Sequence, residues 1–395
     1  MKITTSLLFA ICLLTATTAA AQDDAAVLYS AGTVYTMSGD PISPGQVLVE
    51  NGKIKAVDSV IPAATRGDAK LIELGPDSVL MPGLIDAYTQ SGMGADSSDE
   101  VTKEITPNFR ASRSIDWKAT DIQQRLQAGT TTMCVCPGTQ NVVSGIASIV
   151  KTGGEQVVND DYALVASLCS DPTARNSSRQ RPDSIYVRQP TNRMGVVWIL
   201  RNSLSKVKQG KMDSPPIAEA LDGKRPFFIV SRVAHDLSTA ATLAEEFDFQ
   251  PILVGGQEAY KITDLITDRN YPVILGGTTT GSMFGPEQTE LCWNQAGILD
   301  KAGVTFCISG QNQLEQARFA HRFGLDADKA LTAITKSPAK ILGIDDRVGT
   351  IEIGKDADLV ALQGDPLEFT TDIEWVMVDG KITQPRNTTR QAKGN

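Results

Sequence analysis

Apolar and polar residues alternate in short runs at both ends of the chain, and turn residues separate these runs. Residues 27–34, 46–49 and 53–57 have the composition of strands, and Asn51-Gly52 is a typical hairpin turn between the last two. A similar pattern of short apolar runs separated by turn residues occurs near the C-terminus, where Asp379-Gly380 is a second hairpin dipeptide. The strands predicted there cover residues 349–353, 357–362 and 375–378.

Between these ends, short apolar stretches alternate with helical stretches. Strand–helix repeats build parallel sheets, and eight such strands over about 250 residues are the size of a (β/α)8 barrel. The predicted strands cover residues 79–87, 130–135, 146–151, 162–168, 226–233, 251–254, 272–275 and 304–309. The predicted helices cover residues 119–128, 195–208, 237–247, 259–267, 288–302, 312–323 and 330–342.

A doubly wound nucleotide-binding sheet is the alternative to a barrel. It receives little support, because the glycine-rich stretch at residues 276–281 has neither the P-loop lysine nor the dinucleotide-binding fingerprint. We therefore predict an α/β fold consisting of a TIM-like (β/α)8 barrel, residues 79–345, and a small composite β-sandwich domain. The β-sandwich takes residues 22–78 and 346–385, and residues 386–395 form a tail.

The N-terminus has the pattern of a secretory signal peptide. Lys2 precedes an apolar run at residues 7–14, and small residues ending in Ala19-Ala20-Ala21 supply a cleavage site. The apolar run is too short to span a bilayer, and no later stretch is apolar enough to do so. We expect residues 1–21 to be removed and the mature protein to be exported, either to the periplasm or outside the cell.

Net charge and cysteine content narrow the picture a little further. The net charge is −9, with acidic and basic residues interspersed, which argues against a nucleic-acid partner because such a partner needs a basic face. Without Cys12 the mature chain keeps an odd number of cysteines, so at least one thiol is free. The cysteines of the mature chain are Cys134, Cys136, Cys169, Cys292 and Cys307.

Three stretches resemble the amidohydrolase superfamily, and in particular its imidazolonepropionase-like branch. They are residues 81–87 (MPGLIDA), 330–343 (ALTAITKSPAKILG) and 348–360 (VGTIEIGKDADLV). The resemblance implies the same barrel and composite β domain. It also implies zinc or another divalent metal at the mouth of the barrel, held by histidines, a carboxylated lysine and an aspartate at the ends of the strands.

The residues at these ligand positions differ from the family pattern. Tyr88 and Gln90 stand where the two histidines of the first strand are expected, and the chain has only His235 and His321. Neutral phenol and amide groups are weak ligands for zinc. The other expected ligand positions hold Val165 on strand four, Val230 or Arg232 on strand five, Gly255 on strand six, and Gly310 or Gln311 on strand eight.

We therefore predict no metal and no other cofactor, and a degenerate ligand-binding site at Tyr88, Gln90, Arg232, Gly255 and Gly310. Arg232 is expected either to pair with a remaining carboxylate such as Asp86 or to hold a carboxylate of the ligand. His235 is interpreted as a loop or helix-start residue, and His321 as a residue on a solvated helix face. The thiols of Cys134 and Cys136 are expected on one side of their strand, as small core residues rather than ligands of a soft ion.

Three functions remain open on the sequence. The first is a non-catalytic protein that binds a small molecule, or a related amidohydrolase subunit, through the face of the former active site; a homo- or hetero-oligomer fits this function. The second is an active hydrolase of carbon–nitrogen bonds in amides or cyclic amides with an unrecognised ligand set. The third is a structural subunit with no ligand. A shared fold is weak support for the second.

Overall fold

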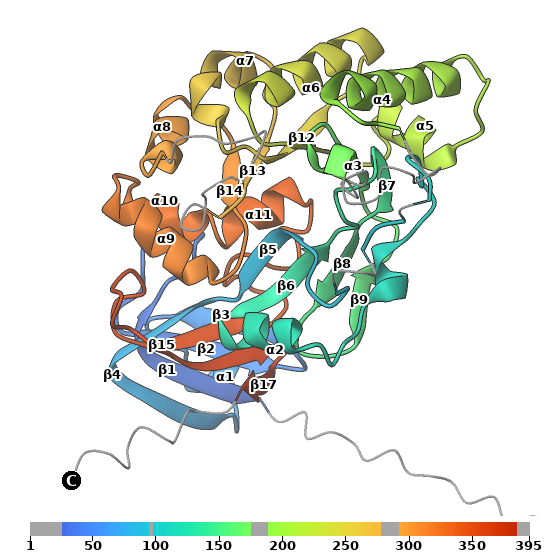
Figure 1. Cartoon of the computed structure of the whole chain (residues 1–395). Coiled ribbons are helices and arrows are strands. Elements are labelled where there is room, and N and C mark those ends of the chain that lie inside the picture. Colours follow the sequence, from blue (N-terminus) through green and yellow to red (C-terminus); the bar gives the residue numbers. More distant parts are fainter. Residues whose placement is uncertain (1–25, 95–97, 101, 175–188, 278–291, 385–395) are drawn as a thin grey trace, which may run out of the picture.

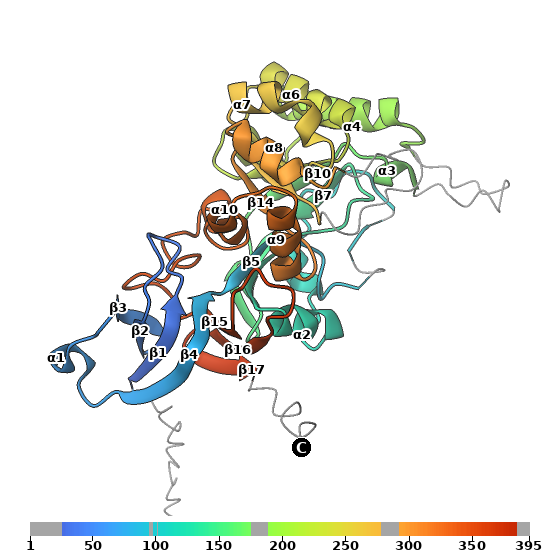
Figure 2. The ribbon, with the colours of Figure 1, turned by 90° about the vertical axis from the view of Figure 1, so that its left-hand side faces the viewer.

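The structure is a computed structural model that describes residues 26–94, 98–100, 102–174, 189–277 and 292–384. The predicted signal peptide and the C-terminal tail lie outside these residues. The chain forms one seven-stranded sheet and an α/β body of two further sheets with helices packed against them (Figures 1 and 2). No helix among the described residues is both long enough and apolar enough to cross a membrane.

The seven-stranded sheet joins the two ends of the chain. β4 lies between β1, its parallel neighbour from the N-terminal region, and β15, its antiparallel neighbour from the C-terminal region. All seven strands belong to one continuous sheet, in the order β17-β16-β15-β4-β1-β2-β3. Their bounds are β1 (Val27–Val34), β2 (Gly45–Glu50), β3 (Lys53–Asp58), β4 (Lys70–Pro82), β15 (Leu359–Gln363), β16 (Ile373–Val378) and β17 (Lys381–Gln384).

Both predicted hairpin turns are confirmed, since Asn51 and Gly52 have φ of 52° and 73°, and Asp379 and Gly380 have 48° and 76°. The predicted strand at residues 349–353 is wrong. Gly349 has φ of 92°, which interrupts an extended run, and Ile351 makes a single backbone hydrogen bond to Thr36. Ile351 is nevertheless fully buried, so its apolar character serves core packing without a strand.

The α/β body contains a six-stranded sheet, β14-β13-β12-β11-β10-β7, and a four-stranded sheet, β5-β6-β8-β9. β10 to β14 are all parallel, as predicted, and so are β5 and β6. The strands are β5 (Leu84–Thr89), β6 (Thr130–Val135), β7 (Val143–Ile146), β8 (Ser148–Lys151), β9 (Gln156–Asn159), β10 (Leu164–Ser167), β11 (Phe227–Ser231), β12 (Pro251–Gly255), β13 (Val273–Leu275) and β14 (Phe306–Ile308).

The predicted strand at residues 79–87 is divided at Gly83. The part before Gly83 ends β4, and the part after it is β5, so the chain turns here from the seven-stranded sheet into the α/β body, as the Pro82-Gly83 dipeptide indicated. A Cβ atom on Gly83 would lie 2.2 Å from Oγ1 of Thr131 on β6. Only glycine therefore allows this close approach.

The predicted parallel strand at residues 146–151 is also wrong. The chain forms β7, antiparallel to β10, and then β8, antiparallel to β6, so it passes from one sheet to the other at Ala147. Every residue from Val142 to Lys151 is buried, so no alternation of polar and apolar residues marked the change. Gly145, with φ of 139°, takes a conformation that other residues rarely adopt.

The helices lie mainly where the sequence predicted them, although short helices were missed. α5 (Pro215–Leu221) was not predicted, and the predicted helix at residues 259–267 is a short 3-10 turn followed by α7. Other helices of this part of the chain are α2 (Thr120–Gln127), α4 (Arg193–Lys208), α6 (Ala234–Phe247), α7 (Thr263–Asp268), α8 (Gln295–Lys301) and α9 (Gln313–Arg322).

The predicted helix at residues 330–342 is instead two short helices, α10 (Ala327–Thr332) and α11 (Lys336–Ile341). A single helix would place the ring of Pro338 against the carbonyl of Ile334. The break leaves that carbonyl free to accept a hydrogen bond from the Ile85 N–H of β5 (3.0 Å), while the Ala333 carbonyl accepts from Ile308 of β14 (2.9 Å). The helix break thus provides hydrogen-bond acceptors for backbone N–H groups of two strands, β5 and β14.

The strands β5 and β14 face each other across a junction without a backbone ladder among the described residues, and side chains join them. The Ser309 hydroxyl donates to the Asp86 carboxylate, and the Gln313 amide donates to the Ile85 carbonyl (2.5 Å). One apolar core receives a side chain from each of eight strands drawn from both sheets: Ile85, Cys134, Ile149, Val165, Val230, Val254, Ile274 and Cys307.

Candidate functional site

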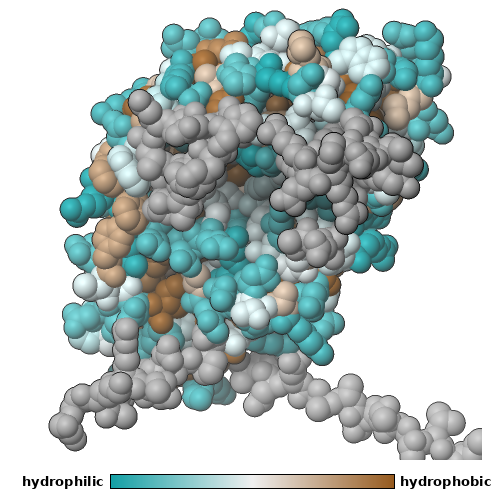
Figure 3. All heavy atoms as spheres, in the orientation of Figure 1, coloured by the Kyte–Doolittle hydropathy of each residue, from teal (hydrophilic) through white to brown (hydrophobic). Residues whose placement is uncertain are grey.

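A cavity of about 400 Å³ opens at the carboxyl ends of the strands of the α/β body. All five positions predicted from the sequence line it: Tyr88, Gln90, Arg232, Gly255 and Gly310. Thr139, Asp171, Gln257 and Ser309 complete most of its polar wall, and the face of the molecule in Figure 3 is hollowed near its centre. The structure therefore brings together residues that lie more than 200 positions apart in the sequence.

The order of the strands explains this convergence. Tyr88 belongs to the end of β5, Arg232 directly follows β11, and Gly255 is the last residue of β12. Gly310 follows β14 by two residues. Since the carboxyl ends of parallel strands meet at one edge, side chains at these ends face a common space.

Arg232 forms a two-pronged ion pair with Asp171, the first residue of α3 (Asp171–Ala174). Its Nη1 and Nη2 lie 2.7 and 2.5 Å from the two carboxylate oxygens, and the Thr139 hydroxyl donates to the same carboxylate. Burial raises the pKa of Asp171, but the Arg232 hydrogen bonds and charge outweigh it and hold that pKa below its ordinary value. The predicted pairing of Arg232 with Asp86 is wrong.

Asp86 is fully buried and pairs instead with Arg125, a residue of α2 that the sequence did not single out. Nη1 of Arg125 lies 2.6 Å from Asp86, and its Nε and Nη2 donate to Ser91 (3.2 Å) and Thr89 (3.1 Å). Burial raises the pKa of Asp86, and the Arg125 charge opposes this shift.

Arg125 also donates to the Gly310 carbonyl, and therefore links β5 to the segment after β14. The sequence did contain a signal for this role. Ile122, Arg125 and Leu126 are the buried residues of α2, so the arginine lies within the apolar stripe of that helix. A charged residue in such a stripe indicates a buried partner.

Two of the predicted ligand positions are glycines whose backbone excludes most side chains. Gly255 has φ of 100° and Gly310 has φ of 129°, values that residues with a Cβ rarely adopt. A Cβ on Gly255 would also lie 3.1 Å from both the Arg232 side chain and Oε1 of Gln257. Backbone strain therefore disfavours a ligand histidine or aspartate at both positions, and two neighbouring side chains also crowd position 255.

Two polar atoms in the cavity wall are buried and make no hydrogen bond to any described residue. They are the hydroxyl oxygen of Tyr88 and Oε1 of Gln257. The Gln90 side chain lies near the Tyr88 hydroxyl and has a small lowering effect on the pKa of Tyr88. Burial raises the pKa of Tyr88 well above its ordinary value, so the phenol is neutral at physiological pH.

Comparison with known proteins identifies the scaffold. The model of the amidohydrolase family matches residues 292–385. An amidohydrolase from Thermotoga maritima is 29% identical, with a TM-score of 0.82 over 91% of this chain and 100% of that structure. The amidohydrolase tasK of Hapsidospora irregularis is 25% identical over 85% of this chain. These similarities support membership in the amidohydrolase superfamily.

The extent of these similarities sets limits on what they imply. The chain spans only 39% of the length of tasK. A zinc-bound structure described as an adenosine deaminase from Xanthomonas campestris is 17% identical with a TM-score of 0.54, which supports the shared fold alone. Neither relative places the chain in one branch of the superfamily.

The divalent metal that amidohydrolases use does not fit the residues at this mouth. No group of three histidine, cysteine, aspartate or glutamate residues able to hold a metal occurs in the described part of the chain. Asp171 and Asp86, the carboxylates at and below the cavity, are each paired with an arginine. A zinc ion would therefore face guanidinium groups and weak neutral ligands in place of imidazole or free carboxylate.

The histidines and cysteines do not supply the missing ligands. Neither His235 nor His321 lines the cavity; the His235 side chain is 59% exposed near Asp236, and His321 bonds to the Leu325 carbonyl. Cys134 and Cys136 lie in the same apolar core, as predicted, with their sulfur atoms 3.9 Å apart. All five cysteines of the described chain are free thiols.

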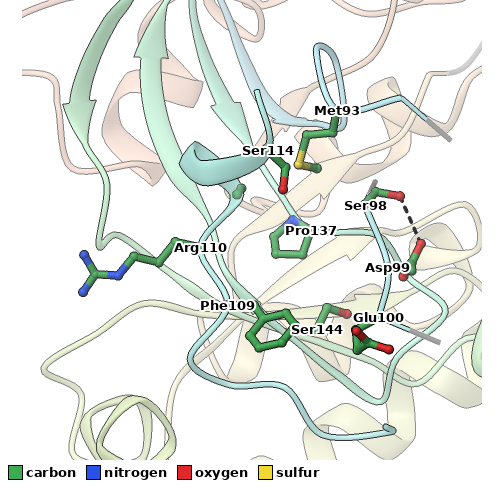
Figure 4. A pocket seen from close by; sticks show the side chains of 10 residues that line it. Met93, Ser98, Asp99, Glu100, Phe109, Arg110, Ser114, Pro137 and Ser144 are labelled. Carbon is green, nitrogen blue, oxygen red and sulfur yellow. Dashed lines mark hydrogen bonds between the residues drawn. The ribbon is translucent and has the colours of Figure 1, made fainter. Parts of the chain in front are cut away.

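A second, smaller cavity of about 190 Å³ lies beside the segment that follows β5. Figure 4 shows the carboxylates of Asp99 and Glu100 on one side of it, Phe109 and Pro137 nearby, and the Arg110 side chain pointing away. Asp99 accepts hydrogen bonds from the Ser98 hydroxyl (3.1 Å) and the Gln140 N–H (2.8 Å). These bonds organise the loop, and this cavity contains none of the predicted site residues.

Proposed function

We propose that this amidohydrolase-family protein binds a small molecule at the carboxyl ends of its strands and does not carry out metal-assisted hydrolysis. We also infer that its two inner sheets act together as a (β/α)8-type barrel, because eight strands share one core. The observation that carries the functional proposal is the backbone at Gly255 and Gly310. Residues with a Cβ rarely adopt their positive φ values, so the backbone disfavours a histidine or an aspartate at these two positions.

Hydrolysis of an amide requires a strong nucleophile near neutral pH. A bound divalent cation supplies it by lowering the pKa of a water molecule. At this mouth the fixed positive charges are guanidinium groups, which orient carboxylates but do not coordinate water as a Lewis acid does. The carboxylates that a general base would use, Asp171 and Asp86, are held in ion pairs.

The cavity is instead suited to hold a ligand. Its volume is within the range of small-molecule sites, and it combines an apolar wall with a few polar groups. Arg232 and Asp171 fix each other, so the wall is rigid before a ligand arrives. A rigid wall lowers the entropic cost of binding.

Hydrolysis of carbon–nitrogen bonds is the second candidate function. The support for it is that two relatives are named amidohydrolases, one matching over 91% and one over 85% of this chain. We also propose a related amidohydrolase subunit as a partner chain. The motive is that tasK contains a large region beyond the part that this chain matches, which a separate chain would supply here. Export by the N-terminal signal remains part of the proposal.

Elemental analysis of the purified full-length protein tests the proposal. We expect far less than one equivalent of zinc or manganese per chain, and no turnover of amides or cyclic amides with either metal added. Stoichiometric metal, together with hydrolysis that disappears on chelation and returns on metal addition, would falsify it and establish the second candidate.

A further inference from the structure

We propose that the cavity selects uncharged ligands, and that Gln257 and Tyr88 recognise the polar edge of such a ligand. This inference rests on the proposed binding function and specifies its ligand class. Asp171 and Arg232 are the only charged residues that line the cavity in the described chain, and each neutralises the other. The pair below them, Asp86 and Arg125, is neutral in the same way.

This internal compensation determines what the cavity accepts. A ligand carboxylate would need a cation, but both guanidinium groups already bond to carboxylates. A ligand ammonium group meets the same difficulty with the two aspartates. Because moving an uncompensated charge out of water is costly, either ion is disfavoured relative to a neutral molecule of the same shape.

The two unpaired polar atoms indicate how a neutral ligand is held. Oε1 of Gln257 requires a hydrogen-bond donor, and the Tyr88 hydroxyl can donate or accept. The glycines at positions 255 and 276 surround the Gln257 amide, and a Cβ on Gly276 would lie 2.9 Å from its Nε2. The amide is therefore confined beside the cavity, and a ligand with a donor at its edge completes its bonding.

The apolar part of the wall gives the shape of the ligand. Val230, Val254 and Ile274 line the cavity, and they are direct neighbours across β11, β12 and β13 in the strand register. Three adjacent branched side chains form a continuous apolar surface. The class that fits both features is an uncharged molecule with a flat apolar face and an N–H or O–H donor at one edge.

Three probes of nearly equal shape test this inference on the mature wild-type protein. Benzamide is neutral, benzoate is an anion and benzamidine is a cation, and ligand-observed NMR titration gives an affinity for each. We expect benzamide to bind at least about tenfold more tightly than either ion. Tighter binding of benzoate or benzamidine overturns the inference while leaving a ligand-binding function intact.

Two variants of Gln257 test the recognition. Gln257→Leu should weaken benzamide binding about tenfold, because the ligand donor loses its acceptor. Gln257→Glu adds an unmatched negative charge and should shift the preference to benzamidine. Gln156→Glu, the same change at an exposed position of β9, should leave all three affinities as in the wild type.

The remaining outcomes are also decisive. If Gln257→Glu and Gln156→Glu respond alike, recognition by Gln257 is wrong even where benzamide is preferred. If none of the three probes binds at millimolar concentration, the inference fails together with the proposed binding function.

Discussion

A single buried arginine links two strands that no backbone ladder joins. Arg125 contacts Asp86 on β5 and the Gly310 carbonyl after β14. Arg125→Ala leaves the fully buried Asp86 carboxylate without its cation, and we expect a loss of about 3–5 kcal/mol in the free energy of unfolding. Urea denaturation measures this loss.

The matched control is Arg201→Ala. Arg201 pairs with Glu246 on the surface, where its side chain is 56% exposed, so solvent screens the pair and stability should change little. Equal effects of the two substitutions would show that Arg125 does not join β5 to β14.

Gly255 carries a second prediction at this scale. Gly255→His should not create a metal ligand at the end of β12, because φ of 100° and the contacts with Arg232 and Gln257 oppose a side chain there. We expect this variant to bind no zinc and to be less stable by about 1–3 kcal/mol. Zinc titration by calorimetry and urea denaturation check the two parts, and tight zinc binding would contradict the prediction.

The five predicted site positions line one cavity, but their partners were not predicted. Tyr88, Gln90, Arg232, Gly255 and Gly310 were chosen because the resemblance to amidohydrolases places ligands at strand ends, and these ends meet in the fold. The partner of Arg232 is not encoded locally, since Asp171 lies 61 residues away on a short helix. Arg125 was not predicted, because its partner Asp86 lies 39 residues away and the apolar spacing of α2 indicates a helix without indicating that partner.

At the scale of elements, the errors occur where local patterns carry no information about direction. A fully buried stretch such as residues 142–151 does not alternate, so one strand and two antiparallel strands have the same pattern. The helix at residues 330–342 was predicted as one because its apolar spacing continues across the break. The carbonyls of Ala333 and Ile334 bond to strands instead, which a local pattern cannot indicate.

The close packing at Gly83, where β4 ends and β5 begins, leads to a prediction about stability. Gly83→Ala places a methyl group 2.2 Å from Thr131, and this overpacking should lower the free energy of unfolding by about 1–3 kcal/mol. Thr131→Gly in the same chain removes the clashing atoms and should recover part of the loss. The control is Gly154→Ala, where an added Cβ meets nothing within 4 Å. Urea denaturation of the wild type, Gly83→Ala, Thr131→Gly, the double variant and the control checks the prediction, and purely additive losses in the double variant would contradict it.

At the scale of the whole molecule, one charge cluster joins the chain ends to the α/β body. Lys151 of β8 is buried, and its ammonium lies 2.6 Å from Asp358, 3.1 Å from Asp356 and 3.2 Å from Asp379. Lys53 of β3 and Arg347 also contact Asp356, at 2.6 and 2.9 Å. Three cations and three carboxylates from distant segments therefore compensate one another.

The cluster predicts how stability depends on pH. Burial raises the pKa of Asp356, but Lys53 and Lys151 outweigh it and hold that pKa below its ordinary value. Its contribution is therefore present above the unfolded value of about 3.9 and is lost as the pH falls through the folded pKa. Burial lowers the pKa of Lys151, but the three aspartates hold it above its ordinary value. That contribution is lost only as the pH rises above about 10.4.

Lys151→Met tests this cluster. The substitution leaves three carboxylates facing one another without their central cation, and we expect a loss of about 3–5 kcal/mol in the free energy of unfolding at neutral pH. Because the destabilisation comes from carboxylate charge, it should shrink as the pH falls toward 4. Adding Asp358→Asn should recover part of the loss at neutral pH, since one unpaired charge disappears while the bond from the Asp379 N–H is kept.

The control is Lys224→Met. Lys224 pairs with Asp222 on the surface, where the lysine side chain is 71% exposed, so stability should change little. A deficit in Lys151→Met that stays constant between pH 4 and 7 would mean that packing, and not charge compensation, joins the two ends of the chain to the α/β body.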